Sequence, residues 1–374
     1  MKQPPPFATP SPSLEAEESA GQAAPRAPAA SRLRRHWRLI LVVSMAFIGA
    51  GWSFLWLVAA QATAGNLRDW VAREQLLGRS WTCADRRLGG FPFRIKVTCD
   101  RPSFHGEVSG AEVSGRLGAL FAAAEVYAPT SIAVAVEGPL DIDSSDGRRL
   151  HAAWASLAVD LVFGADGLDR ASLVADAPQL HAEAPQFGDL TIDARRAETD
   201  VAADSGRPAD TAAVDFSVRI DDGKFQALDR LFGDADPATI QADGIISHLD
   251  ATGGGDLAEA AETWRQAGGA IDLTESLLRK GATEIGASGH LDLDALHRPH
   301  GRIDASGAGL EPVLARYGVP NGALAIDGLL TGLLASPGGT GTRTPETLRL
   351  PLRLENGRVF AGPVRTPLTL PPLY

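Results

Sequence analysis

The chain has few of the residue types that most often carry chemistry. Among 374 residues there are two cysteines, two methionines and three tyrosines, and aromatic side chains make up 6% of the sequence. So few aromatic rings disfavour a carbohydrate-stacking cleft. The sequence contains no P-loop and no G-x-S-x-G nucleophile elbow. Residues 338–342 are glycine-rich but lack the lysine, and Ser288 lies near His290 at a spacing that does not fit an elbow.

Metal-binding patterns are equally sparse. His290, His297 and His300 are the only histidine cluster, and they would bind zinc only if their rings converged. We interpret residues 297–300 as a polar turn between two strands. The many aspartates form no EF-hand loop, and nothing singles out a carboxylate pair for hydrolysis. We therefore expect no enzyme, no catalytic residue, no cofactor and no metal.

Acidic residues outnumber basic ones, with 46 Asp and Glu against 35 Lys and Arg. The formal net charge is −11, which makes the chain a poor electrostatic partner for nucleic acid. The exception is a group of arginines at positions 32, 34, 35 and 38, immediately before an apolar run.

The apolar run, residues 39–60, contains no charged side chain. At about 1.5 Å per residue it is long enough for a hydrocarbon core of roughly 30 Å. Trp37, Trp52 and Trp56 lie towards its ends, where indole rings favour the interface. The preceding arginines place the N-terminus in the cytoplasm by the positive-inside rule. The alternative is a cleaved signal peptide, for which Ala62-Thr63-Ala64 offers a site, although a signal core is usually shorter.

The segments around this run have distinct compositions. Residues 1–31 are rich in proline, alanine, serine and glutamate, which is typical of a disordered tail, here cytoplasmic. Residues 66–78 have the pattern of a short amphipathic helix, with Asn66 as its cap and Gly78 at its end. We expect a stalk that packs on its own domain. The alternative is a helix lying on the bilayer.

Residues 80–374 predict a mainly β (β-rich α+β) domain, with a possible boundary between two halves near residues 200–210. The chain has 40 glycines and 25 prolines, which suits short strands and turns. Apolar and polar residues alternate in several segments, such as 151–163 and 214–220, where Asp221-Asp222-Gly223 predicts a turn. Similar glycine-led strands start at 269, 289 and 301. We expect a long, curved antiparallel sheet with one polar face, interrupted by short helices over 227–232, 256–268 and 310–318.

Cys83 and Cys99, the two cysteines, flank a predicted hairpin. Phe93, Ile95 and Val97 alternate with polar residues, and Gly89-Gly90 predicts a turn back towards Trp81. In an exported compartment a disulfide across these strands is the expected outcome. A redox-active pair would need closer spacing, such as C-x-x-C. Gly90, Phe91, Pro92 and Phe93 are expected to be a structurally central motif, with Pro92 at a strand start.

The segments Trp81-Thr82-Cys83-Ala84-Asp85 and Gly90-Phe91-Pro92-Phe93-Arg94 resemble the alphaproteobacterial domain of unknown function 2125 family. The apolar run, residues 291–301 and the ending at 354–363 match as well. The resemblance implies a periplasm-facing protein of the inner membrane and lends no activity. The glycine-led acidic strands are similar in style to AsmA-type envelope proteins.

These observations lead to two hypotheses about function. The first is a membrane-anchored periplasmic envelope protein that handles lipid or another hydrophobic ligand in an apolar groove of its sheet. The alternative is a non-enzymatic scaffold that binds other envelope proteins through sheet edges or the acidic face. A continuous apolar groove would favour the first, and a closed core with an apolar surface patch the second.

Overall fold

The computed structural model describes residues 30–108, 110–165, 167–184, 188–203, 212–249, 257–310, 313, 316, 348–362 and 364–374. The chain forms two units, Met1–Trp52 and Ser53–Tyr374, and the β-sheet lies wholly in the second. Most of the helix expected over 310–318 and all of the glycine-rich segment 338–342 fall outside the described residues.

One long helix, α1 (Ala30–Leu76), contains the apolar run. Residues His36–Leu76 are long and apolar enough to cross a membrane. The separate helix expected from Asn66 is absent, because α1 runs through Asn66 without a break. The helix ends just before Gly78, whose φ of 75° is the left-handed conformation that commonly terminates helices. α1 also includes the last two residues of the expected tail, and residues 1–29 lie outside the description.

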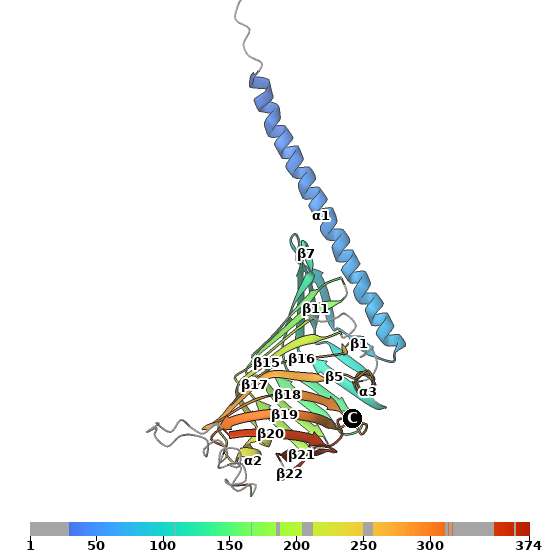
Figure 1. Ribbon diagram of the computed structural model, residues 1–374. Helices are drawn as coiled ribbons and strands as arrows, with labels where there is room; N and C mark the ends of the chain where they lie inside the picture. The colour runs from blue at the N-terminus through green and yellow to red at the C-terminus, as the bar shows by residue number, and fades with distance from the viewer. Residues whose placement is uncertain are drawn as a thin grey trace, which may run out of the picture. The chain divides into compact units, whose positions relative to one another are not determined.

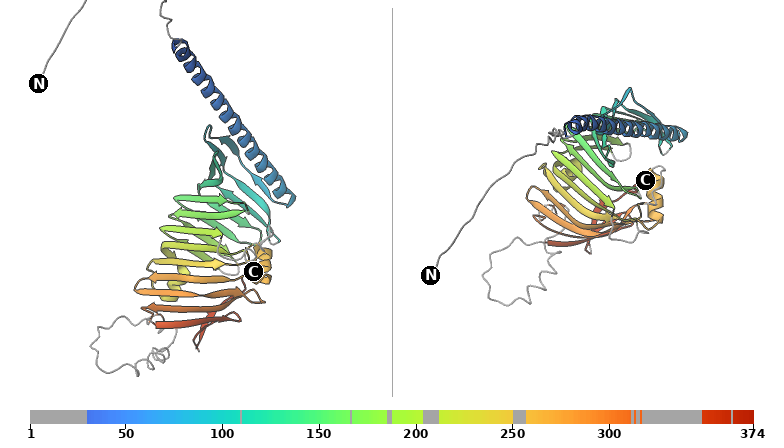
Figure 2. Two further views of the ribbon diagram at one scale, coloured as in Figure 1. Left: turned by 45° about the horizontal axis from the view of Figure 1, so that its top comes forward. Right: turned by 90° about the horizontal axis from the view of Figure 1, so that it is seen from above.

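The prediction of a mainly β fold with a long antiparallel sheet is confirmed. In the described part of the chain, twenty-two strands belong to one hydrogen-bonded network, which has two arms (Figures 1 and 2). The short arm pairs its strands in this order: β1 (Ser80–Thr82), β4 (Ser103–Val108), β5 (Ala111–Leu117), β8 (Leu140–Ser144), β9 (Arg149–Ala153), β12 (Gln179–Ala184) and β13 (Gly188–Asp193).

The long arm contains the remaining strands. In pairing order they are β2 (Asp85–Gly89), β3 (Arg94–Asp100), β6 (Ala119–Glu125), β7 (Ala128–Val136), β10 (Ser156–Phe163), β11 (Leu168–Asp176), β14 (Arg196–Ala203), β15 (Val214–Phe225), β16 (Ala238–Ile246), β17 (Ile271–Lys280), β18 (Thr283–Leu293), β19 (Pro299–Ala308), β20 (Leu348–Glu355), β21 (Arg358–Ala361) and β22 (Val364–Thr369). β13 and β15 join the arms.

The chain alternates between the two arms, because its long strands are bent. β3 continues directly into β4, β5 into β6, β7 into β8, and so on to β14, so each continuous stretch crosses from one arm to the other. The segment 151–163, expected as one strand, is accordingly two, β9 and β10, with the bend at Trp154-Ala155. Up to β15 the sheet is therefore folded along a crease into two layers.

The crease carries a repeated tripeptide: an acidic residue, any residue, then proline. It occurs as Asp100-Arg101-Pro102, Glu137-Gly138-Pro139 and Asp176-Ala177-Pro178, at intervals of 37 and 39 residues. Proline has no N–H to donate and so interrupts a ladder. Arg101 and Ala177 have positive φ, which turns the strand. The repeat has little sequence similarity beyond this tripeptide, because the two arms divide each repeat into short pieces of different composition.

The expected turn at Asp221-Asp222-Gly223 is another crease. Asp222 has a φ of 52°, yet β15 does not end there and runs on to Phe225. The pairing of β15 with β16 shifts register between Ile220 and Gly223, which makes the feature a bulge. It is here that β15 reaches β13 in the short arm.

Apolar residues form continuous rows on one face of the sheet. One row runs through Val97, Ala122, Val134, Val159 and Leu173, each paired with the next across neighbouring strands. Their side chains are half-buried. Among the described residues, the fully buried apolar side chains are mostly alanines. The described chain thus has a small closed core and a long, partly uncovered apolar face.

Two short helices border the long arm. α2 (Gln226–Phe232) follows β15 and confirms the helix expected there. α3 (Leu257–Gln266) confirms the helix expected over 256–268, and Asp256 lies outside the described residues. The Trp264 indole of α3 donates to the Ser247 carbonyl at 2.7 Å. Near α2, the Lys280 ammonium, 1% exposed, pairs with Asp229 and Asp234.

The predicted hairpin is present with a different partner for Trp81. β2 pairs with β3, so Gly89 opposes Lys96 and the turn contains Phe91 to Phe93. Trp81 does not oppose β3, because β1 crosses to the short arm and pairs Trp81 with Phe104. The reason is the crease, which sends the chain after β3 into β4 and leaves β1 beside it.

Candidate functional site

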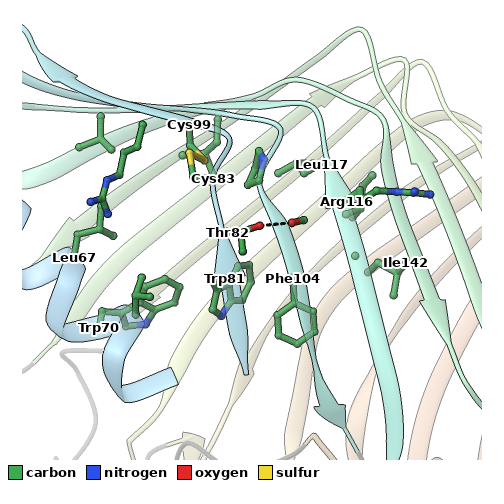
Figure 3. Close-up of a pocket in the computed structure, with 18 of the residues that line it drawn as sticks. Leu67, Trp70, Trp81, Thr82, Cys83, Cys99, Phe104, Arg116, Leu117 and Ile142 are labelled. Atoms are coloured by element: carbon green, nitrogen blue, oxygen red, sulfur yellow. Dashed lines mark hydrogen bonds between the residues drawn. A yellow bond between two sulfur atoms is a disulfide. The ribbon is translucent and has the colours of Figure 1, made fainter. Parts of the chain in front are cut away.

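The apolar faces of the two arms enclose a cavity of about 790 Å³ at the end nearest α1 (Figure 3). This volume lies within the range of small-molecule sites. Its wall is predominantly apolar and comes from α1, both arms and the crease. The lining residues are Leu67, Trp70, Val71, Trp81, Thr82, Cys83, Arg86, Val97, Cys99, Pro102, Ser103, Phe104, Val113, Gly115, Arg116, Leu117, Leu120, Leu140 and Ile142.

Three aromatic rings form one side of the cavity. Trp70 of α1 lies against Trp81 of β1, with ring centroids 5.5 Å apart, and Trp81 lies against Phe104 of β4 at 4.8 Å. Figure 3 shows these rings side by side. Glu74 fixes the row, because its carboxylate accepts from the Trp81 indole at 3.2 Å and from Arg79 at 2.8 Å. The last turns of α1 are thereby attached to the sheet.

The short arm forms the floor of the cavity, because side chains along its strands point alternately into the cavity and away from it. On β5, Val113, Gly115 and Leu117 line the cavity, whereas Ser114 on the opposite face is exposed. Gly115 opposes Phe104 on one side and Ile142 on the other. A Cβ at Gly115 would come no closer than 3.6 Å to a neighbouring atom. Glycine is therefore not required by the backbone here, and its missing side chain leaves space in the cavity.

A second cleft lies between α1 and β2, with a volume of about 460 Å³. Trp56, Leu57 and Leu88 contribute apolar surface, while Arg68 and Arg86 contribute positive charge. Arg86 also lines the main cavity. The cleft and the cavity therefore share a wall, and the cleft borders the last turns of the apolar run.

The described lining of the cavity offers little for acid–base chemistry. It includes two arginines, a threonine, a serine and no carboxylate or imidazole. General acid–base catalysis needs a titrating side chain within hydrogen-bond reach of the substrate. What this cavity can do is hold an apolar molecule, with guanidinium groups at its rim.

The disulfide expected between Cys83 and Cys99 is present and belongs to the cavity wall. Cys99 lies on β3 of the long arm, and Cys83 lies between β1 of the short arm and β2 of the long arm. The bond therefore links the two arms beside the cavity, whereas the sequence predicted a link only between the strands of the hairpin.

The motif Gly90-Phe91-Pro92-Phe93 lies outside the cavity, at the tip of the β2–β3 hairpin. Phe91 is 57% and Phe93 60% exposed, so the motif is peripheral and not part of a core. Pro92 lies in the turn just before β3 begins at Arg94. The Phe91 ring contacts Trp56 of α1 edge-on, with centroids 5.5 Å apart.

The three clustered histidines do not converge. His290 and His300 each bond a neighbouring strand's aspartate, Asp272 and Asp292, at 2.7 Å. His297 stacks on Tyr374. Among the described residues, no group of three histidine, cysteine or acidic side chains could hold a metal ion.

Sequence reasoning missed most of the cavity. Trp70 lies within residues 66–78, which were expected to pack on the domain, but Phe104, Gly115 and Ile142 carried no recognisable signal. Their strands are short and rich in glycine and serine, which weakens the alternation. The acid-x-proline repeat was the available signal, because it marks where the strands change arms.

The fold and the cavity define a class: an open, creased antiparallel sheet with an apolar cavity, attached to a helix able to cross a membrane. Residues 56–368 match the family described as an uncharacterized protein conserved in bacteria, domain of unknown function 2125. The chain belongs to this family. No curated protein matches it.

Proposed function

We propose that this protein is anchored by α1 in the inner membrane, with its N-terminus cytoplasmic, and holds lipid acyl chains in the cavity on the periplasmic side. The observation that carries the proposal is the apolar cavity between the arms, formed partly by α1 itself. The described residues leave this apolar surface half uncovered. Binding of an apolar ligand there is favourable, because it removes apolar surface from water.

The cleft between α1 and β2 supports a phospholipid as the ligand. Its apolar end includes Trp56 and Leu57, within the run that would lie in the bilayer, and Arg68 follows about 17 Å further along α1 at 1.5 Å per residue. A phospholipid has the same order, with acyl chains inward and phosphate outward. Arg68 and Arg86 are placed to bind the phosphate, since charge-assisted bonds to phosphate are strong.

The scaffold hypothesis is weaker on the same observations. It requires a closed core with an apolar patch outside it. The half-buried rows described above instead lie on the inner face and lead into the cavity. Envelope proteins remain possible partners of the polar outer face, on which Asp272 and Asp292 pair with histidines.

A substitution that fills the cavity tests the proposal. Gly115→Phe places a ring in the cavity without a backbone clash, because the nearest atoms to a Cβ there lie at 3.6 Å or more. We expect the wild-type chain, purified in detergent and washed extensively to remove loosely bound lipid, to retain phospholipid detectable by mass spectrometry, and Gly115→Phe to retain much less. Ser114→Phe, on the opposite face of the same strand, is the matched control and should retain as much as wild type. Equal retention by all three proteins, or none by wild type, would refute the proposal.

A further inference from the structure

Two hairpin tips meet beside the apolar run of α1. The first is the β2–β3 turn, and the second is the β6–β7 turn, which contains Tyr127. The Val126 N–H donates to the Phe93 carbonyl at 2.9 Å, so the tips are directly bonded.

These tips carry large aromatic side chains that are mostly exposed. Phe91 is 57%, Phe93 60% and Tyr127 68% exposed. Single exposed apolar residues are common, but three exposed aromatic rings on adjoining turns form a patch, and such patches mark interaction sites.

The contact with Trp56 identifies the partner. Besides the Phe91 ring contact, the Trp56 indole donates to the Arg94 carbonyl at 2.8 Å. Trp56 lies four residues before the end of the apolar run, about 6 Å inside it at 1.5 Å per residue. When α1 spans a bilayer, the tips bonded to Trp56 lie at the depth where the acyl chains meet the headgroups.

The polar residues of the tips suit the same position. Arg94 pairs with Glu125 at 3.4 Å, and Lys96 follows two residues later, on the side of β3 away from the half-buried Val97 row. Tyrosine and tryptophan are enriched at this level of membranes, and long basic side chains reach headgroups from it.

We propose that the Phe91-Pro92-Phe93 and Tyr127 tips insert into the outer leaflet as a second membrane contact. This contact would hold the domain against the bilayer with the α1–β2 cleft facing it. The inference rests on α1 being a membrane anchor and does not require that the cavity holds lipid.

The test places a reporter at each tip of the full-length chain. Both native cysteines are in the disulfide, so Phe93→Cys and Tyr127→Cys give unique thiols for an environment-sensitive fluorophore. Leu296→Cys is the control, because Leu296 is 60% exposed in the turn between β18 and β19. Eight strands separate β3 from β18, or about 40 Å along the sheet at about 4.8 Å per strand.

The labelled proteins are reconstituted into vesicles of phosphatidylethanolamine and phosphatidylglycerol containing a spin-labelled lipid. We expect blue-shifted emission and lipid-dependent quenching at positions 93 and 127, and neither at 296. If the protein floats with the vesicles but both tip labels behave like the control, the second contact is refuted while the anchor stands. If the protein does not float, the anchor itself fails. Lipid retained in the cavity is measured separately.

Discussion

The two-layered part of the sheet, β1 to β15, and the single-layered part, β16 to β22, share one apolar face and hold it in place differently. In the first part the arms face each other across the cavity, and a disulfide and creases fix them. In the second, the described residues opposite the rows are few, and ionic contacts near α2 and α3 stabilise the borders. The comparison shows that the same strand pattern builds either a cavity or an open surface, depending on whether the strands bend.

The largest expected effect concerns Lys280 in the single-layered part. Burial lowers the pKa of this ammonium, but the hydrogen bonds that it donates to the Asp229 and Asp234 carboxylates outweigh burial, so the pKa of Lys280 is raised overall. Lys280→Met leaves both carboxylates unpaired and should cost about 3 kcal/mol, the low end for a broken buried pair, because Asp229 and Asp234 are 30% and 39% exposed. Hydrogen exchange should accelerate in β16 to β18 and stay unchanged in β5 and β8.

The adjacent residue provides the control for this prediction. Arg279 pairs with Glu284 at 2.7 Å, but both side chains are more than half exposed. Arg279→Met should therefore change the free energy of unfolding by about 0.5 kcal/mol or less. If the two variants behave alike, the Lys280 cluster does not hold the single-layered part.

Removing the disulfide tests the same comparison from the other side, because the disulfide lies in the two-layered part. Cys83 and Cys99 are separated by 16 residues in sequence, and closing a loop of that size contributes about 3 kcal/mol in the chain-entropy model. The double variant Cys83→Ser/Cys99→Ser should lose a similar amount of stability, about 3 kcal/mol, with faster exchange in β1 and β4 and none of the change in β17. Faster exchange throughout the sheet would show that the two parts unfold as one.

The smallest effect is pH dependence at the C-terminus. Glu262 of α3 accepts from Arg265 and Gln266 and from the Tyr374 hydroxyl at 3.0 Å. The Arg265 guanidinium first, then Gln266, hold the pKa of Glu262 far below its usual value. A carboxyl whose pKa is lowered on folding stabilises the fold above its unfolded pKa and loses that contribution as the pH falls.

Below about pH 4.5 the attachment of Tyr374 to α3 should therefore weaken progressively. Hydrogen exchange of the Leu373 amide, which donates to the His297 carbonyl beside Tyr374, would report the change once it is corrected for the intrinsic exchange rate. In Glu262→Gln, the protection of this amide should be low already at neutral pH and nearly independent of pH. A wild-type chain in which this amide loses no protection in acid would contradict the assignment.

Sequence patterns predicted the local elements and not their partners. Strand β7, helix α3 and the Cys83–Cys99 pair follow from alternation, propensity and spacing, because these act over a few residues. The pairing of Trp81 with Phe104 does not, since it depends on where a strand leaves one arm for the other. At Asp221-Asp222-Gly223 the residues of a turn instead form a bulge, because β16 continues the ladder beyond it. The cavity depends on such bends, so its lining could not be assembled from pattern alone.

The acid-x-proline repeat relates the length of the chain to the length of the sheet. Each interval of 37 to 39 residues adds two bent strands, and two strands lengthen the sheet by about 10 Å. Because every strand pairs with strands no more than three places away in chain order, an interval inserted or deleted between two creases would change the length of the apolar face without altering either end. Chains with this repeat can thus differ in the length of the apolar face, while the end attached to α1, with its disulfide and aromatic row, stays the same.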